Sequence, residues 1–218
     1  MSDPFNTPVA PAPAGRITLG DNRPAALPVV KRTRIGETFH GAIITAVARD
    51  QQRRLEDGSY VTVYKSDGKA RQEMVITCMV LPGTTALAGI GDDESVPKPG
   101  TLVRLIIKGK MFADWIDAKR ELPDGQIAVG DVVSMATTHA VAYDGPGKGG
   151  PDLTEQAQVD AARQRGKTIG VYGPLVVRVP DPTSEWTAKA IAKYQEMSTP
   201  ARDDRPVVDA QEDDPFNR

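Results

Sequence analysis

The chain has 218 residues, of which 39 % are hydrophobic and 5 % aromatic, and its formal net charge is −2. Its 18 prolines and 20 glycines leave apolar material for one core of about 130–150 residues with polar ends. The near-neutral balance excludes bulk positive charge as an argument for nucleic-acid binding, which must therefore rest on local patches.

The sequence pattern predicts neither a secretion signal nor a membrane span. No Lys/Arg-led apolar segment opens the chain, and no apolar run approaches the roughly 20 residues that a spanning helix needs. The single cysteine, Cys78, lies in an apolar run, which excludes a disulfide framework. We therefore expect a cytoplasmic protein with no membrane partner.

In chain order, residues 1–34 are rich in Pro and Ala, lack apolar periodicity and carry five basic and two acidic side chains. This composition predicts a disordered basic arm. The ordered pattern begins at Gly36. Apolar alternation then predicts strands over 39–48, 60–64 and 72–81.

Residues 82–100 are rich in Gly, Asp and Pro, and they predict a loop. Alternation resumes over 101–108 and predicts a strand. Residues 111–122 have helical spacing, with Met111, Trp115 and Ala118 on the expected core side. The segment 132–143 reads as one further strand.

The next segment is a Gly-rich loop at 144–151, followed by a predicted helix over 153–165. Residues 168–179 predict a last strand, broken near Gly173. An amphipathic helix over 184–197 carries Trp186 and Tyr194 on one face. Those two aromatics suit either docking on the domain or a contact between subunits.

The order of these elements favours a mainly β protein with an OB-fold, a five-stranded antiparallel Greek-key barrel. One helix separates the third and fourth strands, as that fold requires. A generic antiparallel sandwich is the alternative. The predicted organisation is an arm at 1–34, the OB-fold domain at 35–182 with an insertion at 144–166, a helix at 183–198 and an acidic tail at 199–218.

The sequence provides little support for an enzyme. His40 and His139 lie in predicted strands without metal-ligand spacing. The glycines of 145–150 lack the spacer and the Lys-Ser/Thr pair of a phosphate loop. The acidic triplet 92–94 suits a metal-dependent nuclease, the least supported interpretation. We expect no catalytic residue, no metal and no cofactor.

Single-stranded nucleic acids are bound by positive grooves with aromatic faces on which bases stack. Cationic side chains follow the predicted strands of the first half of the chain, and two tyrosines alternate among them. The second and third strands of an OB-fold line its usual binding face. The candidate DNA-binding residues are Arg49, Arg53, Arg54, Tyr60, Tyr64, Lys65, Lys69, Arg71, Arg104, Lys108 and Lys110.

The tail carries six acidic and two basic side chains over 203–218 and ends in Asp213, Asp214, Pro215 and Phe216 before Asn217-Arg218. It resembles the acidic tip of bacterial single-stranded DNA-binding proteins, which ends in an Asp-rich Pro-Phe sequence. That resemblance implies that Asp213, Asp214, Pro215 and Phe216 recruit replication or recombination proteins. The two residues after Phe216 depart from the pattern, in which the Phe is terminal.

The core carries a second resemblance over roughly 35–142. Its pattern lies in Gly-Glu-x-Phe-x-Gly-x-Ile at 36–43, in the Asp-Gly-Lys turn at 67–69 before 74–77, and in 103–109. It is similar to small replication-associated proteins of actinobacterial phages and plasmids. This similarity implies non-enzymatic binding of single-stranded DNA in replication or recombination, in the host cytoplasm. The alternative is a structural or assembly β-domain, with homo-oligomers possible in either case.

Overall fold

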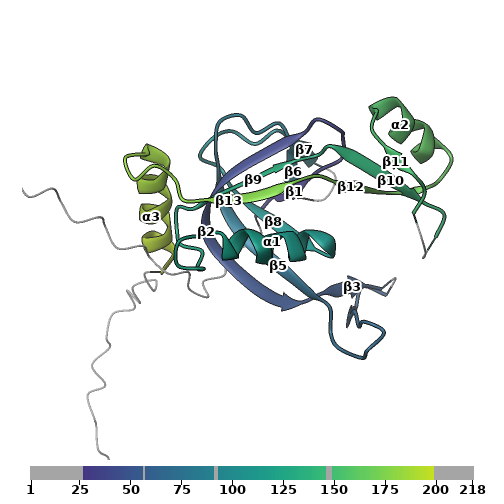
Figure 1. The fold of residues 1–218 in the computed structure, drawn as a ribbon, viewed down its shortest axis with the longest axis horizontal. Coiled ribbons are helices and arrows are strands. Elements are labelled where there is room, and N and C mark those ends of the chain that lie inside the picture. The colour runs from purple at the N-terminus through teal and green to yellow at the C-terminus, as the bar shows by residue number, and fades with distance from the viewer. Residues whose placement is uncertain (1–26, 56, 91–92, 146–148, 199–218) are drawn as a thin grey trace, which may run out of the picture.

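The computed structural model describes residues 27–55, 57–90, 93–145 and 149–198. The protein is mainly β, as predicted, with three helices around a large mixed sheet (Figure 1). None of the helices within these ranges is long and apolar enough to cross a membrane.

The main sheet has eight strands in the order β13-β9-β2-β5-β8-β1-β6-β7. Every neighbouring pair is antiparallel except β1 and β8, which are parallel. In chain order the strands are β1 Val29–Lys31, β2 Thr38–Asp50, β5 Gln72–Val80, β6 Leu87–Ile90, β7 Asp93–Ser95, β8 Leu102–Lys108, β9 Val132–Ala136 and β13 Leu175–Arg178.

The sheet curves around one hydrophobic core. Strand β2 bends at a register shift between Ile43 and Thr45. At Gly41 the ring of Phe39 lies so close that an added Cβ would be 2.8 Å from it. Helix α1 (Lys110–Arg120) covers the core with Trp115, which is 1 % exposed. Because β13 and β6, far apart in strand order, both contribute to this core, the sheet must wrap around it.

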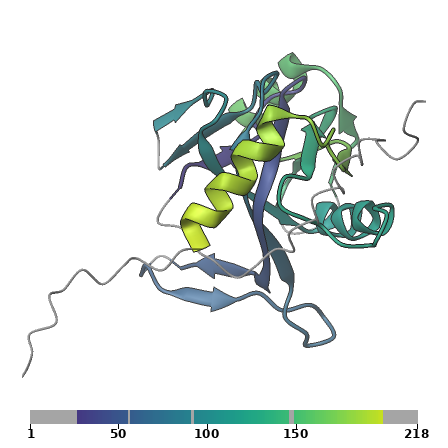
Figure 2. The same cartoon turned by 90° about the vertical axis from the view of Figure 1, so that its left-hand side faces the viewer.

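Helix α3 (Glu185–Ser198) packs on the outer face of the sheet, across β2 (Figure 2). Its Ala190 is buried with Ala42 and Ile44, and Trp186 and Tyr194 pack against that cluster. Of the two roles that the sequence suggested for Trp186 and Tyr194, the structure therefore shows docking on the domain of their own chain.

Two smaller sheets project from the main one. The hairpin of β3 (Gln52–Arg54) and β4 (Tyr60–Thr62) extends the ends of β2 and β5. The second sheet joins β10 (His139–Tyr143), β11 (Asp152–Leu153) and β12 (Thr168–Tyr172). Helix α2 (Gln156–Gln164) packs against it, with Val159 and Ala162 buried.

Two predicted irregular segments contain strands. The arm was predicted to extend to residue 34, but β1 inserts between β8 and β6. The loop at 82–100 contains β6 and β7, and Glu94 of β7 forms an ion pair with Lys31 of β1. These strands are only three or four residues long: β1 and β6 pair with each other across more than 50 residues of chain, and β7 pairs with β6 in a local hairpin.

Two other boundaries were wrong. The strand predicted over 132–143 is divided between two sheets, because Thr137 donates its N–H to the carbonyl of Glu37 and Thr138 donates to Tyr172. The helix predicted from residue 153 begins at Gln156, because Leu153 pairs with Ala140 in β11. The insertion at 144–166 is therefore part of a folded sheet-and-helix unit. The strand predicted over 168–179 is likewise divided, with β12 in the second sheet and β13 in the main one, and β3 was not predicted. The other long strands and the helices lie close to their predicted positions.

Candidate nucleic-acid interface

The β3–β4 hairpin presents two tyrosines to solvent. Tyr60 is 63 % exposed and Tyr64 is 61 % exposed. Backbone hydrogen bonds extend the ribbon toward the main sheet: Gln51 donates to the carbonyl of Arg71 over 2.7 Å, and Arg71 donates to that of Val63 over 2.8 Å. The tyrosines are therefore carried by paired backbone and are held away from the core.

Basic residues neighbour these tyrosines along the backbone of the ribbon. Arg54 is the register partner of Tyr60, and Arg53 is the partner of Val61 on the opposite face of the ribbon. Lys65 and Lys69 close the next turn, between β4 and β5, through a 2.8 Å backbone hydrogen bond. We call the set the hairpin surface: Arg53, Tyr60, Tyr64, Lys65, Lys69 and Arg71. Within the described ranges none of its four cations has an ion-pair partner.

A pocket of about 450 Å³ joins the hairpin surface to the start of α1. Lys65 and Arg71 line one side of it, and Gly109 and Phe112 line the other. The predicted hairpin cations and the first turn of α1 are thus brought together by the fold, although about 40 residues of chain separate them.

A second pocket of about 380 Å³ lies on the other flank of the same turn. Lys110, Met111 and Asp114 of α1 line it together with His139 and Tyr172 of the second sheet. In Figure 1 the hairpin and the second sheet project on the same side, with α1 between them. The two pockets flank the first turn of α1 and so mark a path from the hairpin surface past Lys110 to the second sheet.

Three aromatic side chains lie on that sheet, and we call them the aromatic ladder: His139, Tyr143 and Tyr172. The rings of His139 and Tyr172 stack with centroids 5.6 Å apart and planes inclined by 23°. The hydroxyls of Tyr143 and Tyr172 are 2.6 Å apart. Gly170 lies beneath, where an added Cβ would be 2.9 Å from the Tyr172 hydroxyl. The ladder is thus a packed, ordered arrangement of rings.

The hydrogen bond with Tyr143, together with partial burial, raises the pKa of Tyr172 from 10.0 to about 12. Below pH 10 the Tyr172 hydroxyl keeps its proton in both the folded and the unfolded chain, and its hydrogen bond stabilises the fold. Above pH 10 the unfolded chain ionises first, so we expect this contribution to disappear as the pH approaches 12. Tyr172→Phe should flatten the loss of thermal stability in this window relative to the wild type, and an unchanged profile would contradict the assignment.

The structure does not place every predicted cation on this path. Arg49 binds Glu73, a nearly buried carboxylate, with Nε–Oε1 and Nη2–Oε1 distances of 2.8 and 2.7 Å. Lys108 is the exposed register partner of Glu73 on β8. Arg104 lies beside β1, and its Nε is buried without a hydrogen-bond partner. These three residues belong to the outer sheet face, apart from the hairpin surface.

The other residues that the sequence suggested do not belong to this surface either. The tail residues Asp213, Asp214, Pro215 and Phe216 and the loop residue Asp92 lie outside the described residues. Glu94 of the acidic triplet is taken up by its ion pair with Lys31. Within the described ranges no group of three or more His, Cys, Asp or Glu side chains could hold a metal ion.

Sequence reasoning missed the aromatic ladder. His139 was interpreted as a structural strand residue, and Tyr143 and Tyr172 are 29 positions apart. The strand pattern contains both tyrosines, but their pairing follows from the turn at 137–138 that begins a new sheet. The chain matches no protein-family model, no curated protein and no solved structure.

Proposed function

We propose that the protein binds single-stranded DNA with little sequence preference during replication or recombination, without enzymatic activity. One observation carries the proposal: the exposed Tyr60 and Tyr64 lie near cations that have no ion-pair partner among the described residues, at one end of a path marked by two pockets that leads past Lys110 to the aromatic ladder. Cationic side chains bind the phosphate backbone, and aromatic rings stack with bases of any identity.

The strand order supports an OB-fold at the centre of the protein. Strands β2, β5 and β8 form a meander, α1 follows the third strand, and β9 returns to pair with β2 before β13 adds to its edge. This is the order expected for five OB strands. The hairpin then extends the loop between the first two of these strands, and the second sheet extends the loop between the last two, a pair of loops that bind ligands in this fold.

A fluorescence titration with oligo-dT tests the binding and its electrostatic origin together. Five phosphate contacts, from the four cations of the hairpin surface and Lys110, give a slope of about −3.5 in log affinity against log salt. Affinity should therefore fall about 100-fold between 50 and 200 mM salt. Absence of binding at the lower salt concentration would refute the proposal, and salt-independent binding would refute the path of cations.

The acidic tail serves recruitment in this proposal. Deletion of 203–218 removes six acidic side chains, so the affinity for oligo-dT should stay the same or rise because the anionic tail no longer competes for the cations. Capture of replication or recombination proteins should be lost. Loss of DNA binding on deletion would contradict this role for the tail.

An assembly function is the second candidate, and exposed apolar side chains at the two edges of the main sheet favour it. Val176 and Val179 lie at the β13 edge, and Ile90 and Val96 flank β7 at the other. Exposed edge strands are templates for pairing with another chain. A tight multimer in gel filtration that does not bind oligo-dT would favour assembly over DNA binding.

A further inference from the structure

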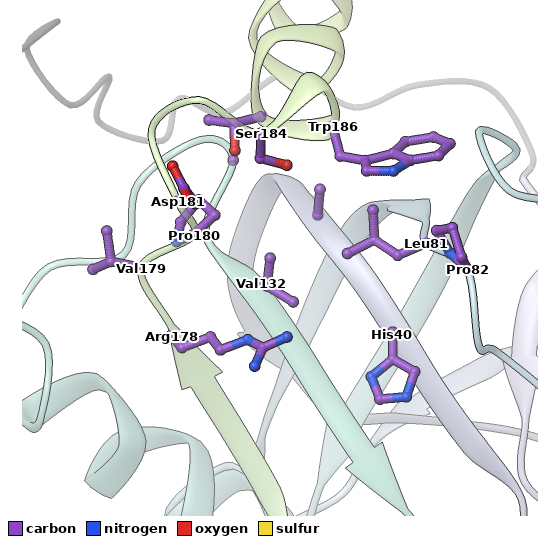
Figure 3. A pocket seen from close by; sticks show the side chains of 13 residues that line it. His40, Leu81, Pro82, Val132, Arg178, Val179, Pro180, Asp181, Ser184 and Trp186 are labelled. Atoms are coloured by element: carbon purple, nitrogen blue, oxygen red, sulfur yellow. The ribbon is translucent and has the colours of Figure 1, made fainter.

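A pocket of about 600 Å³ lies where the first turn of α3 meets the main sheet (Figure 3). Its volume falls in the range of about 300–1,000 Å³ that is usual for small-molecule sites. Beside it α3 closely approaches Gly130, in the turn before β9, where an added Cβ would be 2.9 Å from Cγ2 of Thr187. None of the residues of the hairpin surface or the aromatic ladder lines it.

Two nitrogen-bearing side chains lie on the floor of this pocket. Arg178 projects from β13 and His40 from β2, on either side of β9 and two residues apart in register, so their backbones are about 12 Å apart. In Figure 3 the guanidinium of Arg178 extends across the floor toward His40. A group placed between the two side chains would contact both.

Both side chains have capacity for a ligand. In the described part of the chain Arg178 makes no ion pair or side-chain hydrogen bond. Nδ1 of His40 shares a 2.9 Å hydrogen bond with Oγ of Ser134, which leaves Nε2 for another partner.

The one carboxylate of the lining, Asp181, is already engaged. It accepts hydrogen bonds from the hydroxyl and the backbone N–H of Thr183, at 2.6 and 2.8 Å, and these bonds lower its pKa. Asp181 is therefore ionised, and Thr183 stabilises its charge and occupies part of its hydrogen-bonding capacity.

The rest of the lining is apolar. Leu81, Pro82 and Val132 lie around the floor, and the indole of Trp186 lies above Leu81 and Pro82 (Figure 3). Lys189 covers one face of that indole, with Nζ 4.4 Å from the ring centroid, so the ring acts as a fixed wall. An apolar or aromatic body would find contact here, beside the donors of the floor.

We propose that this pocket binds a small organic phosphate, with its anionic head between Arg178 and His40 and an aromatic body against Leu81, Pro82 and Trp186. Arginine binds phosphate oxygens in pairs through charge-assisted hydrogen bonds. Inorganic phosphate would lack the apolar contacts, and an uncharged aromatic ligand would leave the charge of Arg178 uncompensated. The site is independent of DNA binding at the hairpin surface.

Isothermal titration with phenyl phosphate tests this site, with inorganic phosphate, benzoate and benzyl alcohol as comparators. We expect saturable binding of phenyl phosphate, and at least tenfold weaker binding of inorganic phosphate and benzyl alcohol. Benzoate distinguishes a phosphate head from a carboxylate head. Binding of inorganic phosphate as tight as that of phenyl phosphate, tighter binding of benzoate, or no saturable binding at all would overturn the proposal.

Arg178→Gln should weaken phenyl phosphate binding about tenfold, because one charge-assisted contact is lost. The matched control is Arg120→Gln, which removes an exposed arginine of α1 outside this pocket and should leave binding unchanged. His40→Gln tests the other side of the floor should Arg178→Gln fail to fold. Equal affinities of the wild type and the pocket variants would also overturn the assignment.

Discussion

Replacement of Tyr60 and Tyr64 together by alanine should weaken binding to oligo-dT by at least about 30-fold at low salt. Each stacked base contributes about 1–3 kcal/mol, and every 1.4 kcal/mol changes affinity tenfold. Both rings are more than half exposed, so their removal deletes few contacts of the folded domain. The measurement is a fluorescence titration of the double variant and the wild type in the same buffer.

The double replacement Tyr60→Phe with Tyr64→Phe is the matched control. Phenylalanine keeps a ring for stacking and loses only the hydroxyl, so this variant should retain most of the wild-type affinity. If the alanine variant binds as tightly as the wild type, base stacking on the hairpin surface is wrong. If the phenylalanine variant binds as weakly as the alanine variant, the hydroxyls rather than the rings make the contact.

The elements with long apolar periodicity were predictable because their pattern reflects one large core. Strand β2 has an apolar stretch long enough to be recognised locally, and α1 shows the spacing of Met111, Trp115 and Ala118. The short strands β1, β6 and β7 were not recognised, since three or four residues carry too little periodicity. Lys31 and Glu94 show the difficulty: each looks like a loop charge until the fold brings the two together.

The candidate interface divides in the same way. Tyr60 and Tyr64 alternate with polar residues over five positions, so the sequence alone indicates their exposure. The same alternation along β8 predicts that Arg104 is exposed, yet β1 pairs beside it and its Nε is buried. The aromatic ladder depends on the change of sheet at 137–138, which is a tertiary event. The local pattern therefore predicted the exposed tyrosines of the hairpin surface, whereas long-range packing determined which of the other candidate residues lie near them.

Gly173→Ala should destabilise the protein by at least about 3 kcal/mol, the upper range for an added group in a packed site. Gly173 lies where the second sheet joins the main one, and an added Cβ would be 1.8 Å from the carbonyl oxygen of Ala136. Relief requires backbone movement that strains two hydrogen bonds, Thr138 N–H to Tyr172 O at 2.9 Å and Ala136 N–H to Pro174 O at 3.3 Å. Urea unfolding of the variant and the wild type measures the difference.

Gly150→Ala is the control, since its Cβ would lie 3.5 Å from the carbonyl oxygen of Ala142, an ordinary contact, and it should change stability by no more than about 0.5 kcal/mol. The comparison separates backbone crowding at the junction of the sheets from the general effect of replacing glycine. Because Tyr172 precedes Gly173, movement at this junction should also displace the aromatic ladder and raise the fluorescence of its tyrosines toward that of exposed rings. A stability loss below about 1 kcal/mol for Gly173→Ala would mean that the β12–β13 connection can move away from the β9–β10 connection at little cost, which contradicts a rigid connection between the ladder and the main sheet.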